Sequence, residues 1–162
     1  MTAMIELFLP DAAATDQLGA ALAATRPGSA VVHLHGDLGA GKSTLARALL
    51  RALGVQGAIR SPTYTLVERY PLPGGEAWHL DLYRIGDAGE LDCLGLDEAE
   101  ADLWLVEWPE RGGNALPPLD LRVALDMQGQ GRRARLQASS AAGQAWLSRL
   151  EQSGHLQGFP AA

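Results

Sequence analysis

The feature of this sequence that most constrains its fold is a glycine-rich segment at residues 36–43, which reads GDLGAGKS. The segment fits the pattern G-x-x-x-x-G-K-[ST], in which glycines let the backbone wrap so that its amides point at phosphate oxygens. An apolar run with β-branched residues, 30–35, precedes it and predicts a buried strand. Residues 43–53 follow it and place leucines along one side of a predicted helix. A strand, such a loop and a helix in this order predict a nucleotide-binding site at the start of the helix.

The composition makes the lysine of this segment informative. Lysine and arginine together number 13, and counting them along the chain gives 12 arginines and a single lysine, Lys42. A compact ammonium suits the β- and γ-phosphates inside such a loop, whereas a planar guanidinium does not replace it there. Switch GTPases usually recognise guanine through an Asn-Lys-x-Asp segment, and a chain whose single lysine stands at position 42 has no such segment. The sequence therefore favours ATP as the nucleotide.

The rest of the chain predicts one domain of alternating strands and helices. At 162 residues the chain is long enough to bury a core of its own. We expect an α/β fold of the P-loop NTPase type, with a mainly parallel sheet, antiparallel additions and helices on both faces. The domain is expected to span residues 1–153, and residues 154–162 are expected to form a flexible tail. Further strands are expected at residues 4–9, 64–70, 76–82, 103–106, 119–127 and 132–138, and further helices at 12–25, at 88–101 with an interruption at Gly95, and at 144–150.

Two acidic residues are candidates for holding the Mg²⁺ ion that a nucleotide site of this kind requires. A phosphate loop needs a metal-holding acid at the end of a neighbouring strand. Glu107 directly follows the apolar run 103–106. Asp81 stands at the end of the second strand of a predicted hairpin, where His79 shares its face. Either carboxylate also fits a solvated acid at the end of a strand, and the sequence alone leaves both interpretations open.

A further motif lies between the predicted helix and the hairpin, at residues 60–64 with the sequence RSPTY. Pro62 stiffens this polar loop, which places the Thr63 hydroxyl where it can approach a γ-phosphate and its metal. Loops of this kind order and disorder with the γ-phosphate in many NTPases. An ordinary Ser-Pro turn fits the same residues equally well.

Charge and cysteine content exclude several other classes of protein. A net charge of −6 is a poor electrostatic match for DNA or RNA, so strong direct binding to nucleic acid is not expected. The single cysteine, Cys93, excludes a disulfide framework and a cysteine-based zinc cluster. His33 and His35 lack an evident third metal ligand. No apolar run approaches the roughly 18 residues that a membrane span needs. We therefore expect a cytoplasmic protein without a membrane partner.

Four motifs occur in order along the chain and together resemble the TsaE family (formerly YjeE), the bacterial ATPases of tRNA threonylcarbamoyladenosine biosynthesis. The motifs are GDLGAGKST at residues 36–44, SPTYTLV at 61–67, HLDLYR at 79–84 and VEWPE at 106–110. The first motif alone is unspecific, but four motifs at these spacings are highly specific. The resemblance extends over nearly the whole chain.

The resemblance implies a weak ATPase that uses Mg²⁺ and has the TsaB and TsaD proteins as partners. Those two proteins place a threonylcarbamoyl group on the adenosine next to the tRNA anticodon. Proteins that resemble this chain are thought to cycle the TsaB–TsaD complex through ATP binding and hydrolysis. The resemblance thus implies that tRNA is reached only through the partners, which agrees with the acidic net charge.

The resemblance also implies a role for each motif residue. Ser43 and Glu107 would hold the Mg²⁺ ion. Asp81 would position or activate the attacking water, Thr63 would be the switch residue, and Trp108 would matter for turnover or coupling. The residues implied to contact the nucleotide are Thr15 near the base, Arg132 near the phosphates and, from the loop, Asp37, Leu38, Gly39, Ala40, Gly41, Lys42, Ser43 and Thr44.

Two other functions fit the same phosphate loop. A small-molecule kinase of the P-loop type has a similar size, but it needs a substrate pocket and an arginine-bearing lid, to which residues 112–118 correspond only loosely. A nucleotide-gated adaptor would bind the nucleotide and hydrolyse it only incidentally. Asp81 distinguishes the adaptor from the ATPase, because only the ATPase needs this carboxylate for turnover.

Overall fold

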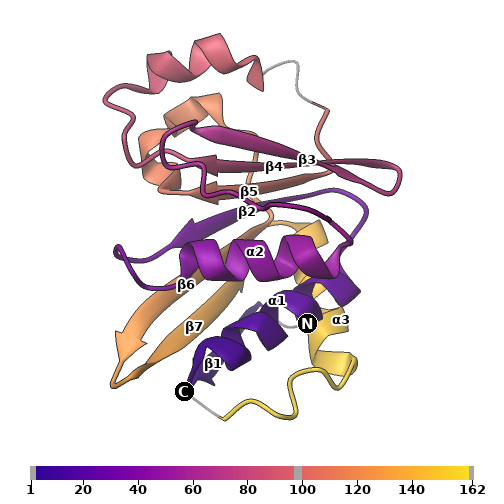
Figure 1. The fold of residues 1–162 in the computed structure, drawn as a ribbon. Helices are drawn as coiled ribbons and strands as arrows, with labels where there is room; N and C mark the ends of the chain where they lie inside the picture. The colour runs from indigo at the N-terminus through magenta and orange to yellow at the C-terminus, as the bar shows by residue number, and fades with distance from the viewer. Residues whose placement is uncertain (1–2, 97–99, 161–162) are drawn as a thin grey trace.

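A seven-stranded sheet forms the centre of the computed structural model, which describes residues 3–96 and 100–160 (Figure 1). The strands are β1 (Met4–Leu9), β2 (Ala30–His35), β3 (Val67–Leu72), β4 (Gly75–Asp81), β5 (Leu103–Glu107), β6 (Leu121–Gln128) and β7 (Gly131–Ala138). Their order across the sheet is β1-β7-β6-β2-β5-β4-β3. Strands β6, β2, β5 and β4 run parallel to one another, whereas β3, β7 and β1 pair with their neighbours antiparallel. This order confirms the expected parallel centre with antiparallel additions.

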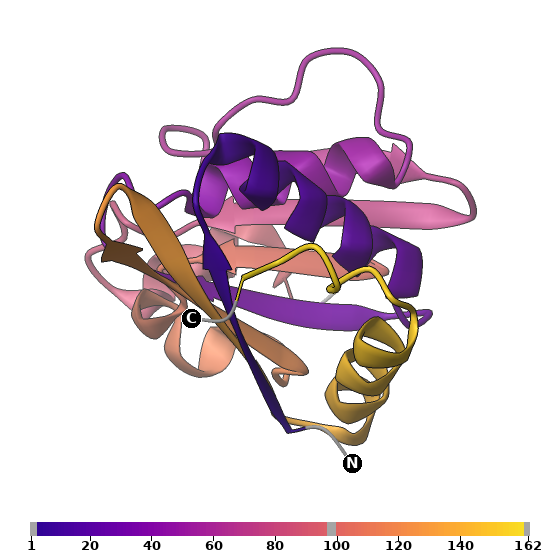
Figure 2. The same ribbon diagram turned by 90° about the horizontal axis from the view of Figure 1, so that it is seen from below.

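Three α-helices pack on one face of the sheet and share its larger hydrophobic core. They are α1 (Ala12–Thr25), α2 (Lys42–Ala52) and α3 (Ala141–Gln152). Figure 2 shows α1 and α2 lying side by side on this face. Each helix buries a large apolar side chain in this core: Leu18, Leu49 and Trp146. No helix in the described part of the chain combines the length and the apolar character needed to cross a membrane.

Helix α1 crosses α2 at Gly19, where the two backbones approach closely. A Cβ atom at this position would lie 2.6 Å from the Cβ of Ala48 and 2.9 Å from the amide nitrogen of Leu49. We expect Gly19→Val to lower the free energy of unfolding by about 1–3 kcal/mol, because the added methyl groups overpack this crossing. Ala20→Val, at the neighbouring exposed position, is the matched control and should lower the free energy of unfolding by less than about 1 kcal/mol. Urea unfolding followed by circular dichroism measures both, and equal losses would contradict the close contact.

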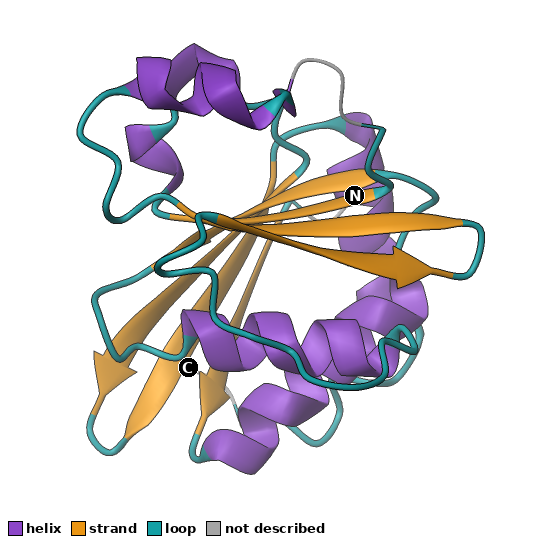
Figure 3. Ribbon diagram, turned by 45° about the horizontal axis from the view of Figure 1, so that its top comes forward, coloured by secondary structure: helices purple, strands orange, loops and turns teal. Residues whose placement is uncertain are grey.

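Short 3-10 helices cover the other face of the sheet over β4 and β5 (Figure 3). They are η1 (Ala88–Leu94), η3 (Pro109–Arg111) and η4 (Gly113–Ala115). Leu91 of η1 belongs to a second buried cluster with Trp78 and Trp104, whose ring centroids lie 5.4 Å apart. Helices on both faces are therefore confirmed, with α-helices on one face and 3-10 helices on the other.

The helix expected over residues 88–101 was predicted too long and of the wrong type. The 3-10 helix η1 ends at Gly95, whose φ of 69° lies in the left-handed region. Glycine adopts this conformation without strain, and it commonly terminates a helix. The expected interruption at Gly95 is confirmed, because Leu96 directly after it is again in 3-10 conformation. Residues 97–99 of the expected helix lie outside the described residues.

Residues 154–160 follow α3 and run back across the molecule toward β1 (Figure 2). Leu156 and Phe159 are partly buried against the larger core. The amide of Phe8 in β1 donates a hydrogen bond to the carbonyl oxygen of Pro160 at 3.1 Å. These contacts give the segment a defined place beside β1, while its flexibility in solution stays a prediction.

Candidate nucleotide-binding site

The glycine-rich loop joins the end of β2 to the beginning of α2, as the sequence predicts. Gly41 precedes the first helical residue with a φ of 105°, and no side chain caps this end of α2. The first amides of α2 and the positive end of its dipole therefore form a ready site for phosphate. Gly36 begins the loop with a φ of 147°, and a Cβ atom there would lie 2.6 Å from the carbonyl oxygen of Leu125 in β6. The loop thus lies against β6 so closely that only glycine fits at position 36.

Lys42 extends from the first turn of α2 over the loop and is 5% exposed. Its ammonium group donates hydrogen bonds to the carbonyl oxygens of Gly36 and Asp37, the second at 3.1 Å. The same group lies 4.6 Å from the ring centroid of Trp108. Burial lowers the pKa of Lys42, and nearby carboxylates, Glu107 foremost, oppose this shift. An ammonium that is already desolvated attracts an anion more strongly than one in bulk water does.

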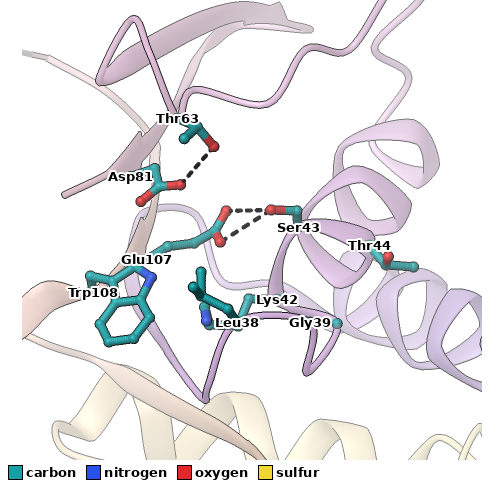
Figure 4. Close-up of a pocket in the computed structure, with 10 residues that line it drawn as sticks. Leu38, Gly39, Lys42, Ser43, Thr44, Thr63, Asp81, Glu107 and Trp108 are labelled. Atoms are coloured by element: carbon teal, nitrogen blue, oxygen red, sulfur yellow. Dashed lines mark hydrogen bonds between the residues drawn. The ribbon is translucent and has the colours of Figure 1, made fainter. Parts of the chain in front are cut away.

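The Ser43 hydroxyl faces the carboxylate of Glu107 across the pocket (Figure 4). Its oxygen lies 3.1 Å from each carboxylate oxygen. Glu107 ends β5, which pairs parallel with β2 so that Leu34 stands opposite Glu107. This register brings the acid beside the loop that follows β2. The structure therefore brings together the two residues expected to hold a metal ion.

The Ser43–Glu107 pair fits Mg²⁺ by the chemistry of its donors. Both side chains offer hard oxygen atoms, which this ion prefers. Across residues 3–96 and 100–160, no group of three or more His, Cys, Asp or Glu side chains forms a metal site. Mg²⁺ does not need such a cluster, because it usually takes one or two protein ligands together with phosphate oxygens and water.

Asp81 and Thr63 form a second pair at the same pocket (Figure 4). Asp81 ends β4 and stands opposite Glu107 of β5 in the parallel register. The Thr63 hydroxyl donates to Oδ2 of Asp81 at 3.2 Å, and the amide of Tyr83 donates to Oδ1 at 3.0 Å. Both oxygens of Asp81 are thus engaged, which holds this carboxylate toward the pocket.

The segment that carries Thr63 differs from the sequence prediction. A strand was expected over residues 64–70, but β3 begins only at Val67. The amide of Leu66 donates to the carbonyl oxygen of Pro62 at 2.8 Å and closes a turn. Leu66 has a φ of 70°, and this left-handed residue directs the chain from the turn into β3. The turn, rather than a strand, therefore carries Thr63 to Asp81.

Trp108 follows Glu107 and lies at the mouth of the pocket. Its φ of 56° is left-handed, an uncommon conformation for a bulky residue. Its ring contacts the Lys42 ammonium and also the ring of Tyr83, whose centroid is 5.0 Å away. The guanidinium of Arg111 lies 5.9 Å from the Trp108 ring centroid. These contacts fix Trp108 against Lys42, and the contact with Lys42 is one that the sequence did not indicate.

One pocket of about 270 Å³ collects most of the predicted site residues. It contains the two pairs described above, Lys42 and Trp108 (Figure 4). Gly39, Gly41, Leu38 and Thr44 complete its wall from the loop and from α2. Asp37 and Ala40 do not line this pocket. They close the loop through a hydrogen bond of 3.0 Å from the Ala40 amide to the Asp37 carbonyl oxygen.

Thr15 and Arg132 line an adjoining pocket of about 180 Å³, which shares Gly39, Gly41 and Thr44 with the first. Thr15 is buried in α1. Arg132 is the second residue of β7 and donates to the carbonyl oxygens of Ala40 and Gly39, each at 3.1 Å. Arg132 therefore braces the phosphate loop, and neither Thr15 nor Arg132 lines the pocket that contains Asp81.

His79 lies next to the site, and its hydrogen-bond partner was not predicted from the sequence. The sequence placed His79 on the same strand face as Asp81, but its Nε2 atom lies 2.6 Å from Oε2 of Glu107. The pairing depends on the register between β4 and β5, in which Leu105 stands opposite His79. Spacing within one strand could not reveal a partner on another strand.

The fold and the site together define an α/β protein of the P-loop class. The family model for "Threonylcarbamoyl adenosine biosynthesis protein TsaE" matches residues 9–135. The tRNA threonylcarbamoyladenosine biosynthesis protein TsaE of Haemophilus influenzae is 43% identical over 120 residues, which is 73% of this chain and 76% of that protein. Its counterpart in Aquifex aeolicus is 35% identical over 135 residues, or 82% and 95% of the two chains. The chain belongs to the TsaE family.

A solved structure supports the fold independently. The crystal structure of Bacillus subtilis YdiB superposes with a TM-score of 0.79 over 94% of this chain and 97% of that chain. The sequence identity is 24%, so this likeness concerns the fold alone.

Proposed function

We propose that this protein binds ATP together with Mg²⁺ and hydrolyses it slowly, in the biosynthesis of tRNA threonylcarbamoyladenosine. The observation that supports this proposal is a single pocket in which the phosphate loop meets the Ser43–Glu107 pair and the carboxylate of Asp81. Membership of the TsaE family supports the place in tRNA modification.

Each side chain of the pocket would have a distinct role in hydrolysis. Lys42 and the loop amides would hold the phosphates, with Ser43 and Glu107 as ligands of the metal. Bound Mg²⁺ would neutralise charge on the β- and γ-phosphates. Asp81 would orient the attacking water and accept its proton. Thr63 donates to Asp81 from a loop turn, so its hydrogen bond can change when a γ-phosphate enters.

A shortage of cations in the pocket supports slow hydrolysis by the protein alone. Among the described residues that line it, Lys42 is the sole cation. Two nearby arginines lie over aromatic rings instead: Arg84 is 4.4 Å from the Tyr64 ring centroid, and Arg111 is 5.3 Å from that of Tyr83. An additional arginine at the transferred phosphoryl group raises rates by about 10³- to 10⁵-fold in related chemistry. We propose that the TsaB–TsaD complex completes or orders this site.

Phosphate release measured with and without TsaB, TsaD and tRNA tests the proposed function. We expect the complex to raise turnover at least about tenfold, because it would stabilise charge that this pocket leaves uncompensated. Absence of stimulation, together with labelled phosphate on a small molecule, would identify a kinase instead. A net charge of −6 supports contact with tRNA through the partners.

Residues 112–118, which correspond only loosely to a kinase lid, pack in part against the sheet. Residues 112–118 contain no arginine. Ala115, at the end of η4, and Leu116 are partly buried and pack against the second buried cluster. A segment anchored in this way is unsuited to close over a substrate with a cationic side chain. The ATPase is therefore favoured over the kinase.

Replacement of Glu107 tests the metal site. Glu107→Gln keeps the shape of the side chain but removes its charge. The factor by which Mg²⁺ lowers the dissociation constant of ADP should therefore be at least about tenfold smaller than in the unmodified protein. Calorimetric titrations with Mg²⁺ and with EDTA measure this difference. Glu110→Gln is the matched control, because Glu110 lies three residues further on with its side chain 52% exposed. Full Mg²⁺ dependence in Glu107→Gln would place the metal elsewhere.

A further inference from the structure

His79 is a buried histidine next to the pocket, and none of the roles proposed above involves it. His79 is 2% exposed and does not line the pocket. Its Nε2 atom lies 2.6 Å from Oε2 of Glu107, whose side chain is 3% exposed. Since Asp81 stands opposite Glu107, His79 reaches this carboxylate along a diagonal between neighbouring strands. A short hydrogen bond therefore anchors the proposed metal ligand from below.

The hydrogen bonds around the ring indicate which nitrogen carries the proton. Glu107 already accepts a hydrogen bond from Ser43, so its carboxylate acts as the acceptor and Nε2 of His79 as the donor. Nδ1 of His79 is buried and has no hydrogen-bond partner within residues 3–96 and 100–160. A proton on Nδ1 would leave a buried donor unsatisfied, at a cost of about 1–3 kcal/mol. The geometry therefore places the donated proton on Nε2, the nitrogen that faces Glu107.

The orphaned Nδ1 atom also argues against a purely structural role. Burying a polar ring with one unsatisfied nitrogen is unfavourable, whereas an apolar side chain would fill this position without that cost. The adjacent strand positions Leu80 and Leu105 are fully buried and apolar. Polar residues that a fold retains at such a cost are concentrated at functional sites. His79 is thus better explained by what it does to Glu107 than by packing.

We propose that His79 is a positioning residue for the metal site. Its Nε2–H group holds Oε2 of Glu107 and so keeps both carboxylate oxygens turned toward Ser43. This inference rests on the proposed role of Glu107 as a ligand of Mg²⁺. Without the donor, the carboxylate can rotate about its side-chain bonds. Ordering it then costs part of the free energy of metal binding. Outer-shell donors of this kind contribute about 10- to 100-fold to metal affinity.

Three variants of His79 distinguish the effect of its hydrogen bond to Glu107 from the effect of its ring filling the site. The amide nitrogen of His79→Gln reaches the place of Nε2, whereas that of His79→Asn ends near Nδ1, short of Glu107. His79→Leu removes the donor altogether. Calorimetry gives the dissociation constant of ADP with EDTA and with Mg²⁺, and the ratio of the two reports metal binding apart from turnover. Titration of Mn²⁺ into the ADP complex, followed by electron paramagnetic resonance, measures the metal directly.

We expect the ratio of the ADP dissociation constants in EDTA and in Mg²⁺ to stay within about threefold of the unmodified protein in His79→Gln. In His79→Asn and His79→Leu it should fall about tenfold or more. The affinity for ADP in EDTA should stay unchanged in all three, since none alters the phosphate loop. An unchanged ratio in His79→Asn, or an equal loss in His79→Gln and His79→Asn, would overturn the proposal. The two amide variants decide the matter even if His79→Leu does not fold. An unmodified protein that binds ADP without any Mg²⁺ effect would overturn the metal role of Glu107 as well, whereas failure to bind ADP at all would overturn the proposed function.

Discussion

Lys42→Ala is expected to weaken ATP binding by about 100-fold or more. A lysine in a phosphate loop makes charge-assisted hydrogen bonds to the β- and γ-phosphates, each worth about 1.5–3 kcal/mol. Loss of about 3 kcal/mol corresponds to about 100-fold in the dissociation constant. Lys42 is 5% exposed and is the sole cation among the described residues lining the pocket, so none of these can take over its role. Calorimetry with a non-hydrolysable ATP analogue measures the loss.

Two further variants make this result specific to the position of the charge. Arg47→Ala removes one positive charge from an exposed site on the same helix, and we expect a change below about threefold. Lys42→Arg keeps the charge but not the compact ammonium, and we expect it to restore little of the affinity. Thermal unfolding controls for loss of structure. An affinity that survives Lys42→Ala would contradict a phosphate site at this loop.

The sequence predicted the parts of the site that depend on local pattern. The glycines of residues 36–41 lie between a strand and a helix, Lys42 begins that helix, and their conformation follows from the motif itself. Glu107 was found because an apolar run ends directly on a carboxylate, and β5 indeed lies beside β2. In both cases, short-range chemistry and the rules for parallel sheets suffice to place the residue.

The parts that the sequence missed depend on contacts between distant segments. The bond between His79 and Glu107 requires the register of β4 on β5, which no single strand encodes. The placement of Trp108 over Lys42 depends on a left-handed residue just after β5, where propensity gives no warning. The turn before β3 was mistaken for a strand because Tyr64, Thr65 and Val67 have strong strand propensity. Tertiary contacts override propensity there, through the bond of Thr63 to Asp81.

Asp81→Asn is expected to lower ATP turnover in the presence of TsaB and TsaD by about 100-fold or more. General-base assistance to an attacking water contributes about 10²- to 10⁴-fold, and an amide cannot accept the proton. Asn keeps an oxygen that can accept the Tyr83 amide, so the local backbone should be preserved. Asp81 has no hydrogen bond to the phosphate loop among the described contacts, so nucleotide affinity should change little. The expected signature is therefore a fall in kcat with nearly constant KM.

Asp126→Asn is the matched control for this loss of charge. Asp126 also lies near the end of a central strand, but on the opposite face of the sheet, where it pairs with Arg133 at 3.6 Å and Arg135 at 3.3 Å. These ion pairs are exposed and contribute at most about 1 kcal/mol, so turnover should stay within about threefold of the unmodified protein. Stimulated turnover that persists in Asp81→Asn would remove the catalytic role of this carboxylate. The protein would then act as a nucleotide-gated adaptor, in which binding rather than hydrolysis conveys the signal to the complex.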